Sequence, residues 1–238
     1  MKVLGIIPAR YASSRYPGKP LLDILGKSMI QRVYEQACKS TLINEVVIAT
    51  DDQRIYDHVL EFNGNVLMTS EHHQNGTERC GEVISNYPDS DVVINIQGDE
   101  PLVKPEQLEL VIQLFEDPTV EIGTLVKPIE DSSEIDNPNR IKVVLDKNGN
   151  ALYFSRSNIP YTREKEAKLK HIGIYAWRMN TLKELIKLEA TELEKKESLE
   201  QLRWLYHGYK IRTAHTTIET PNIDTPEDVE AVLRALNR

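Results

Sequence analysis

The stretch that decides the fold is Val3-Leu4-Gly5-Ile6-Ile7-Pro8-Ala9-Arg10, near the start of a chain of 238 residues. Its first five residues form a continuous apolar run, which is typical of a strand buried on both faces of a sheet. A loop rich in Gly, Pro, Ser and Arg follows, from Pro8 to Pro20. Because ligands bind at the carboxyl ends of parallel strands, this order predicts an α/β sheet with a ligand site on that loop.

Strand and helix patterns alternate after this opening. The expected strands are 45–49, 66–68 and 91–96, and the expected helices are 30–37, 53–61, 77–86 and 105–115. This alternation predicts a mostly parallel central sheet with helices on both faces, a Rossmann-like α/β sandwich of three layers. Loops that begin at Pro8, Thr50, Thr69 and Gln97 should then meet at one edge of the sheet.

The second half of the chain has a less regular pattern. The expected strands are 123–127, 141–145, 151–154 and 172–176, and the expected helices are 181–189, 197–206 and one opened by Thr225 and Pro226. Residues 147–150 read as a hairpin turn. The charged stretch 162–170 predicts a solvated loop and is a candidate lid. No linker divides the sequence, so we expect a single domain over 1–238.

Composition narrows the classes of function. The chain carries a formal net charge of -8, which argues against nucleic acid or an anionic membrane as a partner. No segment approaches the roughly 18 apolar residues of a membrane span. Cys38 and Cys80 form no CxxC pair, so we expect a reduced, cytoplasmic setting in which both thiols pack within helices.

A basic island interrupts this acidic sequence. Arg10, Arg15 and Lys19 lie in the loop after the first strand, together with Ser13 and Ser14. Such cations and local backbone N–H groups can surround a triphosphate. Cations in a loop are more often solvated surface, but their place at the end of a buried strand favours phosphate binding. The loop is neither a Walker A motif nor a GxGxxG turn.

The stretch Ile7–Arg10 with Arg15–Leu21 resembles the signature of sugar nucleotidyltransferases, and of the CMP-Kdo synthetases (3-deoxy-manno-octulosonate cytidylyltransferases) in particular. Further blocks resemble that family in the same order over nearly the whole chain: Gly76–Arg79, Asn95–Pro101, Ala151–Arg156, His171–Tyr175, Leu199–Arg203 and Asp224–Asp228. The resemblance implies a nucleotide-diphospho-sugar transferase-like fold and transfer of CMP from CTP to the anomeric hydroxyl of 3-deoxy-D-manno-octulosonate (Kdo), with release of pyrophosphate. It also implies a cytoplasmic homodimer that supplies activated Kdo for lipopolysaccharide.

The same resemblance implies Mg2+ held by Asp99 and Asp224, which match the metal-binding aspartates of the family. Mg2+ prefers one or two carboxylates with phosphate oxygens and waters. From spacing alone, Asp224 is more simply a helix cap or turn residue. Positioning and charge neutralisation dominate catalysis of this kind, so the expected catalytic residues are Arg10, Lys19 and Asp99.

Two binding sets follow from the resemblance. The nucleotide set is Ala9, Arg10, Ser13, Ser14, Lys19, Ser70, Gly76, Arg79, Gln97 and Asp99. Arg79 and Gln97 are placed around the base, where polar groups left unpaired would reject uracil; without the resemblance, Arg79 reads equally well as a cation on a helix surface.

The sugar set is Arg15, Arg156, His171, Tyr175, Glu200 and Gln201. Arg156 suits a bidentate clamp on the sugar carboxylate. His171 and Tyr175 should share one face of a strand. An exposed helical pair of Glu200 with Arg203 is the ordinary alternative for that block.

Besides the Kdo cytidylyltransferase, three readings stay open: another acceptor sugar, another sugar nucleotidyltransferase that uses UTP or dTTP, and a protein without enzymatic activity. The segment between Pro160 and His171 is shorter than in many family members, so an 8-amino Kdo analogue or another acidic sugar, such as a sialic acid, is an alternative substrate. A nucleotide sensor without enzymatic activity is a different class, but the full set of phosphate, metal and sugar groups favours the enzyme. In that reading, residues 1–120 form mainly the CTP-binding half and 121–238 mainly the sugar-binding and dimerisation half.

Overall fold

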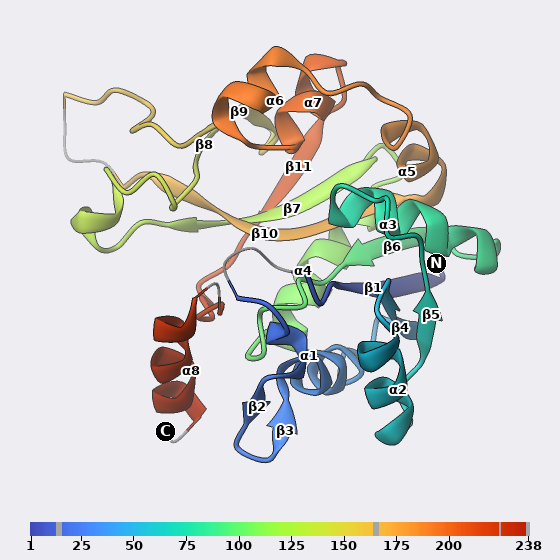
Figure 1. Cartoon of the computed structure of the whole chain (residues 1–238). Helices are drawn as coiled ribbons and strands as arrows, with labels where there is room; N and C mark the ends of the chain where they lie inside the picture. The colour runs from blue at the N-terminus through green and yellow to red at the C-terminus, as the bar shows by residue number, and fades with distance from the viewer. Residues whose placement is uncertain (13–15, 164–166, 224, 237–238) are drawn as a thin grey trace. The chain divides into compact units, whose positions relative to one another are not determined.

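The computed structural model describes residues 1–12, 16–163, 167–223 and 225–236. The chain folds as two compact units, of which the first comprises Met1–Glu109 with Thr220–Arg238 and the second Leu110–Glu219 (Figure 1). The first unit therefore contains both ends of the chain. The C-terminal segment groups with the nucleotide half, although the sequence analysis had placed it with the sugar-binding half.

A parallel sheet forms the centre of the first unit. Its strands lie in the order β6 (Val92–Asn95), β1 (Val3–Ala9), β4 (Glu45–Thr50) and β5 (Val66–Met68). Leu4 and Ile7 on β1 are at most 1% exposed, as expected of a strand covered on both faces. This sheet confirms the predicted α/β class and the predicted strands of the first half.

Helices cover both faces of that sheet. They are α1 (Met29–Ala37), α2 (Gln53–Glu61) and α3 (Gly76–Val83), and α4 (Pro105–Gln113) follows β6. The side chains of Ile7 and of Ile30 on α1 both lie within 4 Å of the place a Cβ would take at Gly98, and the next residue, Pro8, lies beside Gly76 of α3. Because consecutive strand residues point to opposite faces, α1 and α3 lie on opposite sides of β1. The Ser28 hydroxyl caps α1 by accepting from the Gln31 N–H.

The C-terminal segment completes the apolar core of the first unit. It contains the short 3-10 turn Pro226–Asp228 and helix α8 (Val229–Leu236), and Thr225 forms a capping box with Asp228. Ile223 and Val232 are fully buried against Ile24 and Met29. Ile24 belongs to a small hairpin of β2 (Asp23–Ile24) and β3 (Lys27–Ser28) that the sequence analysis did not predict.

The second unit is built on a mixed sheet. In it, β7 (Ile122–Pro128) pairs antiparallel with β10 (Leu169–Arg178) and parallel with β11 (Ile211–His215), and the hairpin β8 (Lys142–Leu145) and β9 (Ala151–Ser155) joins through β10. Its helices are α5 (Met179–Leu185), α6 (Glu192–Glu197) and α7 (Gln201–Tyr206). The hairpin turn is confirmed, whereas β11 was not predicted.

Several expectations for the second unit are wrong. The helix predicted over 197–206 begins only at Gln201, because α6 ends at Glu197 and Ser198 after it adopts a left-handed φ of 52°. The helix predicted over 181–189 begins at Met179 and ends at Leu185. The solvated loop predicted over 162–170 fails at its C-terminal end, where Lys168 and Lys170 are buried. Residues 164–166 of that loop lie outside the described residues.

Two further observations bear on composition. Cys80 is buried within α3 as expected, but Cys38 caps the end of α1 and is exposed, so its predicted packing role is wrong. No helix within the described ranges is both long and apolar enough to cross a bilayer.

Candidate nucleotide pocket and sugar-site residues

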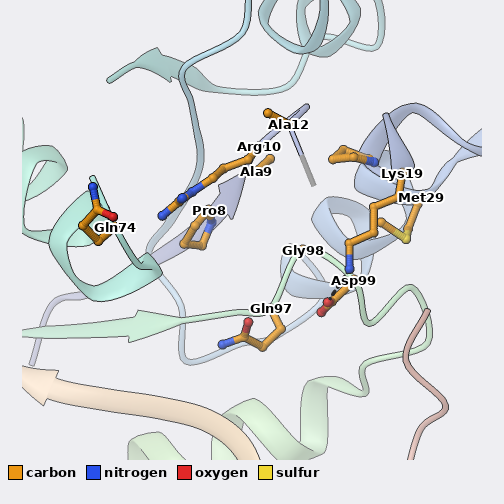
Figure 2. A pocket seen from close by; sticks show the side chains of 11 residues that line it. Pro8, Ala9, Arg10, Ala12, Lys19, Met29, Gln74, Gln97, Gly98 and Asp99 are labelled. Atoms are coloured by element: carbon orange, nitrogen blue, oxygen red, sulfur yellow. Dashed lines mark hydrogen bonds and ion pairs between the residues drawn. The ribbon is translucent and has the colours of Figure 1, made fainter. Parts of the chain in front are cut away.

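A pocket of about 490 Å³ opens in the first unit where β1 and β6 end (Figure 2). The described residues that line it are Pro8, Ala9, Arg10, Ala12, Lys19, Pro20, Met29, Gln74, Gln97, Gly98 and Asp99. The loop after β6 can approach the end of β1 this closely only with glycine at position 98, because a Cβ there would lie 2.7 Å from the Pro8 carbonyl oxygen. Three of the four predicted loops therefore meet, whereas the loop at Thr50 adds no lining residue among those described.

An ion pair closes one end of the pocket. Lys19 Nζ lies 2.8 Å from Asp99 Oδ2 and also donates to the Ile223 carbonyl oxygen at 3.0 Å. The Ile223 N–H in turn donates to the Asp99 carbonyl oxygen at 2.9 Å. Figure 2 shows the Lys19 and Asp99 side chains pointing toward one another. This end thus offers a cation and a carboxylate together, as a nucleotide site that uses a divalent cation requires.

Arg10 supplies the second cation of the pocket. It is partly buried, and burial together with the charge of Arg79 lowers the pKa of Arg10. Arg79 is itself wholly buried, donates to Thr69 Oγ1 and pairs with Asp51 Oδ2 at 2.6 Å. The reading of Arg79 as a helix-surface cation is therefore wrong. Its guanidinium is absent from the described lining, and its positive charge disfavours the charged form of Arg10, whereas Asp51 and Glu78 favour it.

Of the other residues predicted near the base, one lines the pocket and two lie outside its described lining. Gln97 lines the pocket, whereas Ser70 and Gly76 do not belong to its described lining. The Ser70 N–H donates to Glu82 Oε2. The first residue of α3, Gly76, packs on Pro8. Contacts of Ser70, Gly76 and Arg79 with a nucleotide stay predictions.

Sequence reasoning missed one polar lining residue, Gln74. Its amide Nε2 donates to the His72 carbonyl oxygen at 2.9 Å, and its backbone N–H donates to Glu78 Oε2 at 2.8 Å. Gln74 lies directly before Asn75, the N-cap of α3. That position, at the end of the polar loop after β5, is the only signal in the sequence that could have indicated it.

The predicted metal site is described in part. Asp99 lies in the pocket, and its side chain is 25% exposed beside a cation. Asp224 lies outside the described residues, as do Ser13, Ser14 and Arg15. In the described ranges no three His, Cys, Asp or Glu residues form a metal-binding group. Asp99 can supply one of the one or two carboxylates that Mg2+ takes, with phosphate oxygens and waters completing the shell.

Glu100, next to Asp99, is not an equivalent ligand. Burial and the neighbouring Asp99 charge raise the pKa of Glu100 to about 8. Its carboxyl is therefore largely protonated near neutral pH, and it accepts weakly from Thr220 Oγ1 at 3.5 Å. Of the two adjacent carboxyl groups, Asp99 is the one that carries charge into the pocket.

In the second unit, His171 and Tyr175 share a strand face as predicted. Their ring centroids are 5.1 Å apart, despite a bulge in β10 between Ile172 and Tyr175. His171 Nε2 lies 2.9 Å from Thr124 Oγ1, whose hydroxyl donates to the Ile174 carbonyl oxygen, so Nε2 carries a proton. Burial lowers the pKa of His171 to about 3, which keeps the ring neutral.

The hydroxyl of Tyr175 is an orphaned polar group. Its oxygen is buried and has no hydrogen-bond partner in the part of the chain that the structure describes. Burial and the charge of Glu200 raise the pKa of Tyr175 well above its usual value. A buried hydroxyl without a partner fits a position completed by a ligand or by water.

Arg156 is anchored by backbone carbonyl groups. Its Nε donates to the Glu197 oxygen at 2.6 Å, Nη1 to Pro138 at 3.0 Å and Nη2 to Ser198 at 3.2 Å. These bonds use three of the five guanidinium N–H groups and leave two for a carboxylate. Its role as a sugar clamp stays a prediction.

The α7 block differs from the exposed pair considered above. Gln201 is 5% exposed, and the buried Arg203 pairs with Glu194 through Nε at 2.7 Å and Nη2 at 2.6 Å. The reading of Glu200 and Arg203 as an exposed pair is therefore wrong for Arg203. Sugar contacts of Glu200 and Gln201 stay predictions.

Comparison with known proteins agrees with the pocket. The family model described as cytidylyltransferase matches residues 4–211. A 3-deoxy-manno-octulosonate cytidylyltransferase of Parabacteroides distasonis is 51% identical and covers 99% of this chain and 98% of its own length. That of Bacteroides thetaiotaomicron is 52% identical, with coverages of 97% and 96%. A solved CMP:2-keto-3-deoxy-manno-octonic acid synthetase, complexed with CTP, superposes with a TM-score of 0.95 at 44% identity, over 100% and 99% of the two chains.

These matches extend over almost the full length of both partners. In this chain, the pocket at the strand ends carries two of the predicted cations, Arg10 and Lys19, and the predicted carboxylate of Asp99. The chain belongs to the cytidylyltransferase family, among the 3-deoxy-manno-octulosonate cytidylyltransferases.

Proposed function

We propose that this chain transfers CMP from CTP to the anomeric hydroxyl of Kdo and releases pyrophosphate. The observation that carries the proposal is the pocket at the ends of β1 and β6, where Lys19, Arg10 and Asp99 converge in a chain of net charge -8. Relatives of about 50% identity over nearly the whole chain, named for this reaction, support the same conclusion.

The charge of each pocket residue determines which part of CTP or Mg2+ it would bind. Lys19 and Arg10 neutralise the β- and γ-phosphates and hold CTP with its α-phosphorus exposed to attack. Asp99, with Asp224, would hold Mg2+, which when bound lowers the charge on the α-phosphate and stabilises the departing pyrophosphate. Gln97 offers a carboxamide to the base edge. The sugar hydroxyl attacks in line, so no activated nucleophile from the protein is needed.

Most of the proposed acceptor contacts come from the second unit, and Arg15 comes from the first. Arg156 has two further N–H donors that can bind the sugar carboxylate. The Tyr175 hydroxyl has no hydrogen-bond partner among the described residues and can bind a sugar hydroxyl. His171 is neutral, so it would contribute a hydrogen bond rather than charge. Arg15, Glu200 and Gln201 complete the proposed contacts. A homodimer, a cytoplasmic location and a supply of activated Kdo for lipopolysaccharide are part of the same proposal.

A panel of substrates tests this function. Pyrophosphate release is measured with CTP, UTP or dTTP, each combined with Kdo, 8-amino Kdo or a sialic acid, in the presence of Mg2+. We expect CTP with Kdo to give the highest kcat/KM, because polar groups that pair with cytosine are left unpaired by uracil or thymine. The relatives' shared name favours Kdo over the other acidic sugars.

The same panel separates the alternatives. Faster turnover of 8-amino Kdo or a sialic acid would reassign the acceptor within the same reaction class. CTP binding without pyrophosphate release from any acceptor would indicate a nucleotide sensor and would overturn the proposal.

A further inference from the structure

Tyr11 stands between two pocket residues, Arg10 and Ala12, but is itself outside the described lining. Its ring is covered by a cation from another element. The guanidinium carbon of Arg54 lies 3.3 Å from the centroid of the Tyr11 ring. Arg54 belongs to the first turn of α2, which adds no residue to the described lining of the pocket. This contact therefore joins the pocket loop to a helix that takes no direct part in the site.

Arg54 is held in the orientation that stacking requires. Its Nε donates to Asp52 Oδ1 at 2.9 Å and its Nη2 to Asp52 Oδ2 at 2.6 Å. Two parallel hydrogen bonds fix the plane of a guanidinium group. Asp52 is itself fixed, because it is the N-cap of α2 and accepts from the Arg54 backbone N–H. The stack is thus pre-oriented although the Arg54 side chain is 59% exposed.

Tyr11 also contacts the far end of the loop. The Gly18 N–H donates to the Tyr11 carbonyl oxygen at 2.9 Å, which closes the loop. Gly18 has a φ of +73°, and a Cβ there would lie 3.1 Å from Cζ of the Tyr11 ring. Glycine allows both this backbone conformation and the close approach of the ring. Tyr11 therefore connects Arg54 with both ends of the loop.

The arrangement has a direct consequence for the pocket cations. Arg10 precedes Tyr11 and Lys19 follows Gly18, so each cation lies next to one of the two residues that the Gly18–Tyr11 hydrogen bond joins. We propose that Arg54 is a positioning residue, which sets the spacing of Arg10 and Lys19 by stacking on Tyr11 before CTP binds. Holding two binding cations at their spacing before the ligand arrives reduces the entropy that binding would otherwise cost. The inference rests on the proposed function, because it assigns CTP to this pocket.

The test is the affinity of the full chain for CTP with Mg2+ and without sugar, measured by titration calorimetry. Arg54→Met removes the stack, and we expect the Kd for CTP to rise roughly two- to fivefold, the range of an exposed cation–π contact. Arg54→Lys keeps the charge but lacks the planar fork, and we expect it to lose affinity as well. In steady-state assays the KM for CTP should rise while kcat and the KM for Kdo hold.

Companion variants separate positioning from a general effect on folding. Tyr11→Leu should weaken CTP binding as Arg54→Met does, and the double variant should be no weaker than either one. Tyr11→Phe retains the ring and should restore the affinity. Arg234→Met is the matched control, since Arg234 is an exposed, ion-paired arginine on α8, 72% exposed. Thermal unfolding verifies that each variant is folded.

Wild-type affinity in Arg54→Met, or additive losses in the double variant, would overturn the positioning role. An equal loss in Arg234→Met would do the same, because the effect would then be one of net charge. Failure of the wild-type chain to bind CTP would contradict the proposed function and the positioning role together, whereas tight wild-type binding with no effect of Arg54→Met contradicts the positioning role alone.

Discussion

The charge state of single residues decides what each part of this chain can bind. Lys19 and Asp99 meet in the pocket as opposite charges, which phosphate and a divalent cation can each use. His171 is neutral, because burial lowers its pKa to about 3. A sugar carboxylate bound near His171 would therefore need Arg156 for its charge. Within the predicted sugar set, His171 would therefore offer a hydrogen bond, and Arg156 would offer a positive charge.

His171 also gives a prediction about stability in acid. The folded-state pKa lies below the usual 6.5, so the unfolded chain binds a proton that the folded chain does not between about 6.5 and about 3. The free energy of unfolding therefore falls as pH drops through that window. We expect His171→Gln to lose less stability than wild type between pH 7 and pH 4.5, measured by urea unfolding at both values. Equal losses in the two proteins would refute the buried neutral ring.

Residues at strand ends could be predicted from sequence, and residues defined by distant partners could not. Arg10 directly follows β1, and Gln97 and Asp99 lie in the loop after β6; a parallel sheet brings the ends of such strands together. Arg79 read equally well as a surface cation, because its partner Asp51 is far away in the chain. The sequence around Arg79 gives no sign that its side chain pairs with Asp51.

At the scale of elements, the α6–α7 region shows how a local conformation overrides propensity. The sequence pattern predicted a helix that begins at Glu197, but α6 ends there, Ser198 is left-handed and the next helix begins only at Gln201. Leu199 N–H donates to the Glu194 carbonyl oxygen, and the Glu194 carboxylate holds Arg203 of the next helix. The tertiary pairing of Glu194 with Arg203 compensates for the break, and sequence periodicity alone did not reveal it.

The start of α6 can be tested directly. Thr191 and Glu194 form a capping box, in which each side chain accepts from the other residue's backbone N–H. We expect Thr191→Ala to lower the free energy of unfolding by about 1 kcal/mol, because an N–H of the first turn loses its acceptor. Thr191→Ser keeps the hydroxyl and should stay near wild type. Urea unfolding at neutral pH measures both, and an unchanged midpoint for Thr191→Ala would contradict the capping role.

At the scale of the whole molecule, the first unit is closed by residues from the far end of the chain. The sequence predicted the final helix and its cap but not where that helix docks, because docking depends on apolar neighbours that are distant in sequence. Ile223 and Val232 complete a core with Ile24 and Met29, and Met29 also lines the pocket. The pocket therefore depends on a segment outside the half to which the sequence analysis assigned CTP.

This dependence predicts a coupled loss in Ile223→Ala. Removing a fully buried isoleucine side chain should lower the free energy of unfolding by about 2–5 kcal/mol. Because the Ile223 backbone holds both Lys19 Nζ and the Asp99 carbonyl oxygen, CTP binding should weaken as well. Ile84→Ala, at a buried position outside the described pocket lining, is the control and should lose stability but keep CTP affinity. Equal CTP affinities in the two variants would contradict the coupling.

The central claim is that Asp99 serves the chemistry of CMP transfer, and the rate of pyrophosphate release by Asp99→Asn with CTP, Kdo and Mg2+ tests it most directly. We predict that turnover falls by at least about 100-fold while thermal unfolding shows an intact fold, because a neutral amide would hold Mg2+ far less tightly than the Asp99 carboxylate. Asp89→Asn, at an exposed position, should turn over as wild type does. An Asp99→Asn protein that keeps a large share of the wild-type rate would contradict the account.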